Sequence, residues 1–364
     1  MKKIISIALA LLMVAVMLPV MAMAEGSTLQ SRIDAGDTTI TLTENVTESI
    51  TIPAGKTVTL NLNGNTLTNE ADKDTITVAL GGILTIEGPG IVDNVSHGRA
   101  AVYNNGTVTI NGGTYTRSKE AGTGNPNSDR GNSWYTICNH GDMIVNAGVV
   151  ENKGTFSSVF ENGYYSYTKN AEREGYVEGT NNAAPKLTIN GGTFEGGKIT
   201  IKNDDGGILE INNGTFTNAW NRVVYNTNVA TINGGSFSCP ATNEIAVDSN
   251  KLNDNLNKGV MTITGGTFDG KVTQSNGTFT VSGGTFKKGV DESYIVDGKK
   301  LDTNGNVVPE TITIIVPSDG GNTTTTPSTD NTKNPSTGAN DFVGVAAAMA
   351  VVSLLGAAAV IRKK

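Results

Sequence analysis

Two short polar segments carry the residue types that acid–base catalysis uses. Asp204 and Asp205 are adjacent carboxylates, and Asn139-His140-Gly141 contains one of the two histidines of the chain. Paired carboxyl groups can act as general acid and general base, and an imidazole can carry a proton near neutral pH. Both segments, however, occupy the same repeat position as Asn104-Asn105-Gly106, which has no titratable group. Because Asn, Asp and Gly are common in tight turns, the pattern favours turns, and catalysis by Asp204, Asp205 and His140 is the alternative.

Oxygen ligands for a metal ion are sparse in this sequence. A polysaccharide lyase needs several carboxylates around Ca²⁺ and a basic residue. The carboxylates near the central repeats are Asp142, Glu161, Asp204 and Asp205, and one loop adds Asn125, Asn127 and Asp129 without a closing Glu. His97 and His140 lie in different repeats, which leaves too few partners for a zinc or Ser-His-Asp site. The sequence therefore predicts no metal and no cofactor, with calcium as the alternative.

The aromatic residues divide into two groups by their position in a repeat. One group occupies a single repeat position and predicts a stacked ladder of rings: Tyr115, Phe194, Phe216, Phe237, Phe268 and Phe286. The other group lies outside that position: Trp134, Tyr135, Tyr164, Tyr165, Tyr167 and Trp220. Flat rings of the second group can stack on sugars or form a protein-binding patch. The competing interpretation is that they pack the loops against the repeats.

A repeated unit of strand and turn must position all of these residues. Its clearest copy runs from Leu187 to Phe194, where apolar and polar residues alternate before a glycine turn. Further copies begin at Leu60, Leu84, Val108, Leu209, Ala230, Met261 and Phe279, with a degenerate copy at Met143. The starts differ by 24 residues from Leu60 to Leu84 and by 18 from Met261 to Phe279. A period of this size predicts a solenoid.

A second strand, ending in asparagine, precedes several copies. These asparagines are Asn104, Asn139, Asn203 and Asn226, and three of them lie seven residues before the asparagine of the next copy, at Asn111, Asn146 and Asn233. We therefore expect the asparagines to stack from coil to coil. Parallel strands wound around one axis predict an all-β fold, a right-handed parallel β-helix.

The segments beside the repeats predict caps and a tether. The β-helix covers residues 25–300 and begins with a short helix near 29–33 that hides the first coil, and residues 301–316 form a closing strand region. Residues 317–333 are rich in Thr, Ser, Asn, Gly and Pro and predict a flexible tether. The run from Val58 to Leu67 resembles the opening of secreted, pectin-lyase-like β-helical surface proteins of Gram-positive bacteria.

The amino-terminal segment and the composition indicate export. Residues 1–24 combine Lys2-Lys3, an apolar run and Ala22-Met23-Ala24, the pattern of a secretory signal peptide.

Cys138 and Cys239 are separated by several coils of about 4.8 Å each, too far for a disulfide, so two separate thiols are expected. The formal charge of −7 has no basic run, which argues against a nucleic-acid partner.

The carboxyl-terminal segment has three parts in a fixed order. Residues 334–338, Asn334-Pro335-Ser336-Thr337-Gly338, precede an apolar run over 342–361 and then the basic end Arg362-Lys363-Lys364. A run of about 20 apolar residues is long enough to span a bilayer, and it completes the sorting segment 334–364. This end resembles a cell-wall sorting signal, with Asn334 in place of the usual leucine. The resemblance implies that a sortase attacks the Thr337 carbonyl, releases Gly338 and passes the chain to peptidoglycan.

These features together predict an extracellular, wall-anchored surface protein that acts as an adhesin or as a structural or glycan-binding module. Its expected partners are sortase, peptidoglycan, and a host or cell-surface glycan or protein. The alternative is a wall-bound polysaccharide lyase or glycoside hydrolase, because parallel β-helices include pectate lyases and polygalacturonases. Against that alternative, His140 precedes Asp204, no glycine precedes His140, and no Arg-Ile-Lys segment follows.

Overall fold

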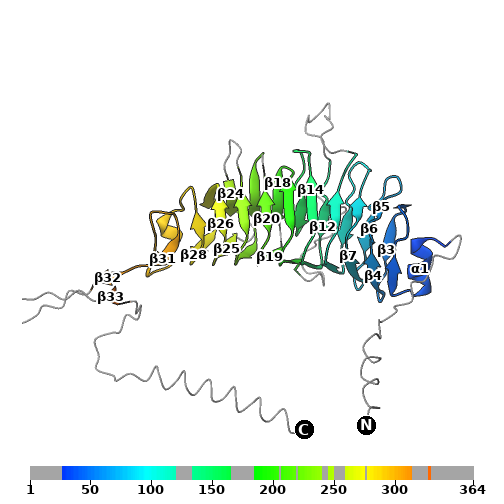
Figure 1. The fold of residues 1–364 in the computed structure, drawn as a ribbon, viewed down its shortest axis with the longest axis horizontal. Helices are drawn as coiled ribbons and strands as arrows, with labels where there is room; N and C mark the ends of the chain where they lie inside the picture. The colour runs from blue at the N-terminus through cyan, green and yellow to red at the C-terminus, as the bar shows by residue number, and fades with distance from the viewer. Residues whose placement is uncertain are drawn as a thin grey trace, which may run out of the picture. The chain divides into compact units, whose positions relative to one another are not determined.

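The computed structural model describes residues 27–119, 133–164, 184–204, 206–218, 220–239, 245–249, 259–274, 277–313 and 327–328. Most of its regular structure is short β-strand, and the strands form three parallel sheets, which we name A, B and C (Figure 1). The chain visits the three sheets in turn, and each strand pairs in parallel with the strand one coil later. This arrangement is a parallel β-helix.

Each coil contributes one strand to each sheet, except the last, which has strands in sheets A and B only. Sheet A contains β1 (Thr39–Thr41), β4 (Thr57–Asn61), β7 (Ile83–Glu87), β10 (Thr107–Ile110), β13 (Asp142–Val145), β16 (Lys186–Ile189), β19 (Ile208–Ile211), β22 (Val229–Ile232), β25 (Val260–Ile263) and β28 (Thr278–Val281). Sheet B contains β2 (Val46–Thr47), β5 (Thr66–Thr68), β8 (Ile91–Asp93), β11 (Thr114–Thr116), β14 (Val149–Asn152), β17 (Thr193–Gly196), β20 (Thr215–Thr217), β23 (Ser236–Ser238), β26 (Thr267–Asp269) and β29 (Thr285–Phe286). Sheet C contains β3 (Ile50–Ile52), β6 (Ile76–Val78), β9 (Val102–Asn104), β12 (Ile137–Asn139), β15 (Phe160–Asn162), β18 (Ile199–Asn203), β21 (Arg222–Asn226), β24 (Ile245–Ser249) and β27 (Lys271–Gln274).

Alternation of apolar and polar residues decides which side chains enter the core. In β16 of sheet A, Leu187 and Ile189 are buried, and Leu187 pairs with Met143 on one side and Leu209 on the other. Successive residues of a strand point to opposite faces, so the in-register aliphatic residues form a continuous core. The register differs from the sequence prediction at the first copy, because Leu84 pairs with Val58 and not with Leu60. The turn that follows β4 is one residue longer than the turn that follows β7, because Leu60 pairs with Ile86 whereas Thr66 pairs with Ile91.

The aromatic ladder predicted from the sequence is confirmed. Phe194, Phe216, Phe237, Phe268 and Phe286 stack one upon the next with ring centroids 4.7–4.9 Å apart and interplanar angles of 4–8°. Tyr115 occupies the same row, but Val150 lies between it and Phe194, so the prediction that its ring joins the stack is wrong. A glycine lies two residues before each of these phenylalanines. The sequence repeats glycine at this position because a side chain there would be strained and would crowd the ring. Gly235, for example, has φ +104°, and a Cβ there would lie 3.3 Å from the Phe237 ring.

Two asparagine ladders run along the stack, as expected. At the end of sheet C, Asn104, Asn139, Asn162, Asn203 and Asn226 are fully buried, and each amide donates to the next at 2.7 Å. The sequence did not reveal Asn162 as a member, because a long insertion follows it. At the turn after sheet A, Asn111, Asn146, Asn190, Asn212 and Asn233 form an exposed ladder with distances of 2.8–2.9 Å.

The two ladders allow a matched test of buried against exposed hydrogen bonds. Asn162→Ala is expected to destabilise the protein by about 2–5 kcal/mol, because it removes one of the two ladder hydrogen bonds of each of the buried side chains Asn139 and Asn203. Asn146→Ala, in the exposed ladder, is expected to cost less than about 1 kcal/mol, because water replaces the lost bonds. Urea denaturation measures both values. Equal losses would show that the buried ladder has no special energetic role.

Both ends of the stack are covered. The helix α1 (Leu29–Ala35) is the predicted amino-terminal cap: it buries Leu29 and Ile33, and Glu48 accepts hydrogen bonds from its first backbone amides. At the other end, the 3-10 helix η1 (Glu292–Tyr294) places Tyr294 against Phe279, and β30 (Lys299–Leu301) pairs with β31 (Val307–Pro309). In a second unit, β32 (Ile312–Thr313) pairs with β33 (Pro327–Ser328).

The expectation of two separate thiols is also confirmed. Cys138 and Cys239 are both buried and neither forms a disulfide. Cys138 lies on the outer face of sheet C, whereas Cys239 belongs to the main core.

Candidate functional site

The outer face of sheet C carries one side chain from each coil in exact strand register. Starting at the first coil, this outer row is Thr51, Thr77, Tyr103, Cys138, Glu161, Lys202 and Tyr225. The row changes in character along its length. Tyr103 in β9 is partly exposed, but all three residues of β12 and of β15 are buried, so the central coils are covered on their outer side.

Four charged or titratable side chains meet under that cover, and we name them the buried charge cluster: His140, Glu161, Lys202 and Asp204. Glu161 Oε2 lies 3.8 Å from His140 Nε2, longer than a hydrogen bond, and Lys202 forms an ion pair with Asp204. Glu161 and Asp204 are fully buried. The strand register explains the assembly, because Glu161 pairs with Lys202, while His140 and Asp204 follow ladder asparagines one coil to either side.

Aromatic rings close the cluster from outside. His140 packs against Tyr103 in an edge-on contact and against Tyr164 in a tilted contact, both with centroids 5.0 Å apart. Tyr135 lies over the ammonium group of Lys202, with its centroid 5.9 Å away. Tyr164 is buried, so the cluster is sealed by its neighbours in this structure.

Burial changes the protonation of Glu161. Removal from water raises the pKa of its carboxyl to about 8, and the nearby Asp204 acts in the same direction. Lys202 is the largest opposing influence and lowers the pKa, and hydrogen bonding from Cys138 and Tyr135 lowers it further. At pH 7 Glu161 is therefore mostly a neutral acid. Chemically the cluster can hold a proton, but a fully buried carboxyl cannot touch a polymer substrate.

The structure brings together some of the predicted catalytic residues and separates others. His140 and Asp204, which the sequence proposed as alternative catalytic residues, both belong to the buried charge cluster. Glu161, from the predicted calcium set, belongs to it as well. Asp142 is exposed on β13 of sheet A, away from this face. Asp205 and the set Asn125, Asn127 and Asp129 lie outside the described residues. Among the residues that the structure describes, no group of three His, Cys, Asp or Glu side chains could hold a metal ion.

The predicted ligand-binding rings are also divided. Trp134 and Tyr135 contact each other edge-on with centroids 5.4 Å apart, and Tyr135 and Tyr164 are buried as covers. Trp220 stays 45% exposed just before β21. Tyr165 and Tyr167 lie outside the described residues. Packing therefore accounts for Tyr135 and Tyr164, while Trp220 keeps a surface that can meet a ligand.

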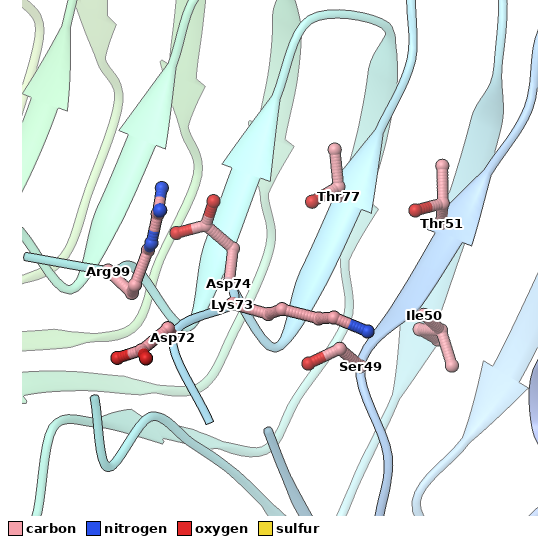
Figure 2. A pocket seen from close by; sticks show the side chains of 8 residues that line it. All are labelled: Ser49, Ile50, Thr51, Asp72, Lys73, Asp74, Thr77 and Arg99. Carbon is pink, nitrogen blue, oxygen red and sulfur yellow. The ribbon is translucent and has the colours of Figure 1, made fainter. Parts of the chain in front are cut away.

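An open groove lies on the same face, over the first coils. It has a volume of about 350 Å³ and is lined by Ser49, Ile50, Thr51, Asp72, Lys73, Asp74, Thr77 and Arg99 (Figure 2). None of these residues was singled out in the sequence. The signal that could have found them is the outward threonine of the Ile-Thr-Ile and Ile-Thr-Val strands, placed beside a charged turn.

A second, smaller groove of about 210 Å³ lies on sheet B between Glu151 and Glu195. These glutamates are direct partners on β14 and β17. Burial raises the pKa of Glu151, Lys153 lowers it, and Glu195 raises it again. Two acidic residues alone do not define a site.

Comparisons with known proteins assign no family. No family model matches the sequence, and neither a curated protein nor a solved structure shows significant similarity to it. Within the described ranges, no helix has both the length and the apolar composition needed to cross a membrane. The apolar run at 342–361 falls outside those ranges.

Proposed function

We propose that this protein is a surface protein of a Gram-positive cell, secreted and then joined to peptidoglycan by a sortase through Thr337. The β-helix, right-handed and similar to pectin-lyase-like proteins, is the part displayed to the outside. It acts as an adhesin or glycan-binding module and not as an enzyme.

The observation that carries this proposal is the order of parts at the carboxyl end. Pro335, Thr337 and Gly338 match a sorting motif, and an apolar run and three basic residues follow it. A membrane segment with a basic stop holds the motif at the outer membrane surface, where a sortase thiolate can reach the Thr337 carbonyl. Gly338 has no side chain to block that approach.

The covered ends of the β-helix support a display role. Because α1 closes one end and η1 with the β30–β31 hairpin closes the other, neither end offers an open row of strands for end-to-end polymerisation. The sides of the stack, and above all the outer face of sheet C, are then the surfaces for a ligand.

Glycan cleavage is the second candidate, and the observation in its favour is the meeting of His140, Glu161 and Asp204. Glycosidases use two carboxyl groups that flank the substrate bond. Here both carboxyl groups are fully buried, and Lys202 already pairs with Asp204. The burial of both carboxyl groups therefore argues against glycan cleavage at this cluster.

Point variants within the sorting motif test the anchoring. Thr337→Ala and Pro335→Ala are expected to lower the wall-bound fraction at least tenfold, because sortase reads both residues, and the protein moves to the membrane or the medium. Immunoblots of wall, membrane and medium fractions provide the measurement. Ser336→Ala, at the variable position of the motif, is the matched control and should stay on the wall. Unchanged wall attachment of Thr337→Ala would refute the proposal.

A further inference from the structure

We propose that the open groove over the first coils of sheet C, lined by Thr51, Asp74, Thr77 and Arg99, binds a neutral hydroxyl-rich saccharide. This inference rests on the proposed role in glycan binding and adds the site and the ligand class. Four observations carry it: the spacing of the hydroxyls, the position of Asp74, the balance of charge and the rigidity of the turns.

The floor of the groove presents two hydroxyls from adjacent strands. Thr51 of β3 and Thr77 of β6 are direct partners in the outer row, so their Oγ1 atoms lie on one face about one strand spacing apart. Figure 2 shows the two side chains side by side above the Lys73 side chain. Among the described residues, no hydrogen bond uses either hydroxyl. Both can therefore donate to and accept from a ligand.

Asp74 supplies the strongest acceptor of the groove. Its Oδ1 accepts a hydrogen bond of 2.6 Å from the Ala100 amide, which fixes the carboxylate and leaves Oδ2 for a ligand. Burial raises the pKa of Asp74, while the Ala100 amide and the cations Arg99 and Arg117 lower it. A fixed carboxylate beside a guanidinium can accept from one sugar hydroxyl while the guanidinium donates to the next.

The charges that line the groove cancel. Asp72 and Asp74 carry two negative charges, and Lys73 and Arg99 carry two positive charges. Polyanionic glycans are attracted by clusters of one positive sign, which this groove lacks. The lining has many donors and acceptors and no net charge, so it matches a neutral sugar better than a uronic acid polymer.

Buried polar side chains hold the charged turn in place. Asn69 donates to the Glu70 and Lys73 carbonyls, and Asn94 donates to the carbonyls of Lys73 and Ala100. Both asparagines are buried, so the turn is ordered before a ligand arrives. Binding to a preorganised turn loses less conformational entropy. On the other side, Gln30 of α1 exchanges two hydrogen bonds with the backbone of Thr51.

Calorimetry with the purified full-length chain in detergent tests the proposal. The probes are cellotetraose, mannotriose and the tetramer of N-acetylglucosamine, which are neutral, and trigalacturonic acid, which is charged. At least one neutral probe should bind with a Kd below about 1 mM, and trigalacturonic acid should bind more weakly. Arg99→Gln and Asp74→Asn should each weaken that binding about tenfold or more, because each removes a charge-assisted hydrogen bond. Thr77→Val keeps the strand and should weaken binding by a smaller factor.

The controls distinguish loss of the binding site from loss of the fold. They also distinguish failure of this proposal from failure of the proposed function. Asn can still accept from the Ala100 amide, and an unchanged unfolding midpoint would show that Asp74→Asn is folded. Glu151→Gln, in the groove of sheet B, should leave binding unchanged. The absence of binding by every neutral probe, wild-type affinity in both charge variants, or tighter binding of trigalacturonic acid would overturn the groove as the site. Binding that is kept in these variants and lost in Trp220→Ala would retain a glycan-binding function but reject the groove. The wall-anchoring test is independent of all these outcomes.

Discussion

Glu161→Gln is expected to remove a large part of the dependence of protein stability on pH. The folded state raises the pKa of Glu161 from 4.5 to about 8, so the folded protein favours the protonated acid. The stability that Glu161 contributes is fully present below pH 4.5, and it is lost as the pH rises through 8. The difference corresponds to about 5 kcal/mol between these two limits. Glutamine keeps the size of the side chain and cannot ionise, so the variant lacks this loss.

Urea denaturation at several pH values between 4 and 9 measures the effect. The free energy of unfolding of the wild type should fall relative to that of Glu161→Gln as the pH rises, and the gap should be largest above pH 8. Asp142→Asn is the control, because Asp142 is exposed on sheet A, and it should follow the wild type within about 0.5 kcal/mol. Parallel pH profiles for the wild type and Glu161→Gln would mean that Glu161 is not held neutral in the folded protein.

Phe216→Ala is expected to destabilise the protein by about 3–5 kcal/mol. Phe216 is fully buried and stacks on Phe194 at 4.9 Å and on Phe237 at 4.7 Å. The truncation removes apolar burial and leaves a cavity between two rings. Neighbouring coils are joined by backbone hydrogen bonds at fixed spacing, so the coils cannot collapse to fill the space.

An exposed phenylalanine provides the matched comparison. Phe156 is 48% exposed, and Phe156→Ala should cost less than about 1 kcal/mol. Thermal or urea unfolding of both variants measures the difference. If Phe216→Ala lost no more stability than Phe156→Ala, the ladder would be a by-product of the repeat and not a stabilising element.

Local patterns made most of the scaffold predictable. Alternation of apolar and polar residues identified the strands. The spacing from Asn139 to Asn146 recurs in other copies, and this recurrence identified the stacking. The prediction was wrong where an insertion changed the count, as at Leu60, and incomplete where a loop hid a repeat, as at Asn162. These are errors of register. A turn can absorb extra residues without changing the alternation inside a strand.

The candidate sites were much less predictable. The sequence singled out Asp204 and His140 as polar turn residues and placed Glu161 among the carboxylates of the central repeats, but nothing in it indicated Lys202 or the burial of the four side chains together. It passed over Thr51, Thr77 and Arg99, which look like ordinary surface residues when each is read alone. A site on a solenoid is assembled across coils, and residues one coil apart are separated by a variable number of positions.

The sequence by itself determined that this chain is a β-solenoid with stacked rings and asparagines, because strand alternation and repeat spacing are local properties. It also contains the export and sorting patterns on which the proposed function depends. Only the tertiary structure decided which outward side chains became buried. Burial over β12 and β15, where Tyr135 and Tyr164 are also buried, raises the pKa of Glu161, while Thr51 stays exposed and Thr77 partly exposed. Burial and charge depend on what packs against a strand from other coils, and that packing is not written in the strand itself.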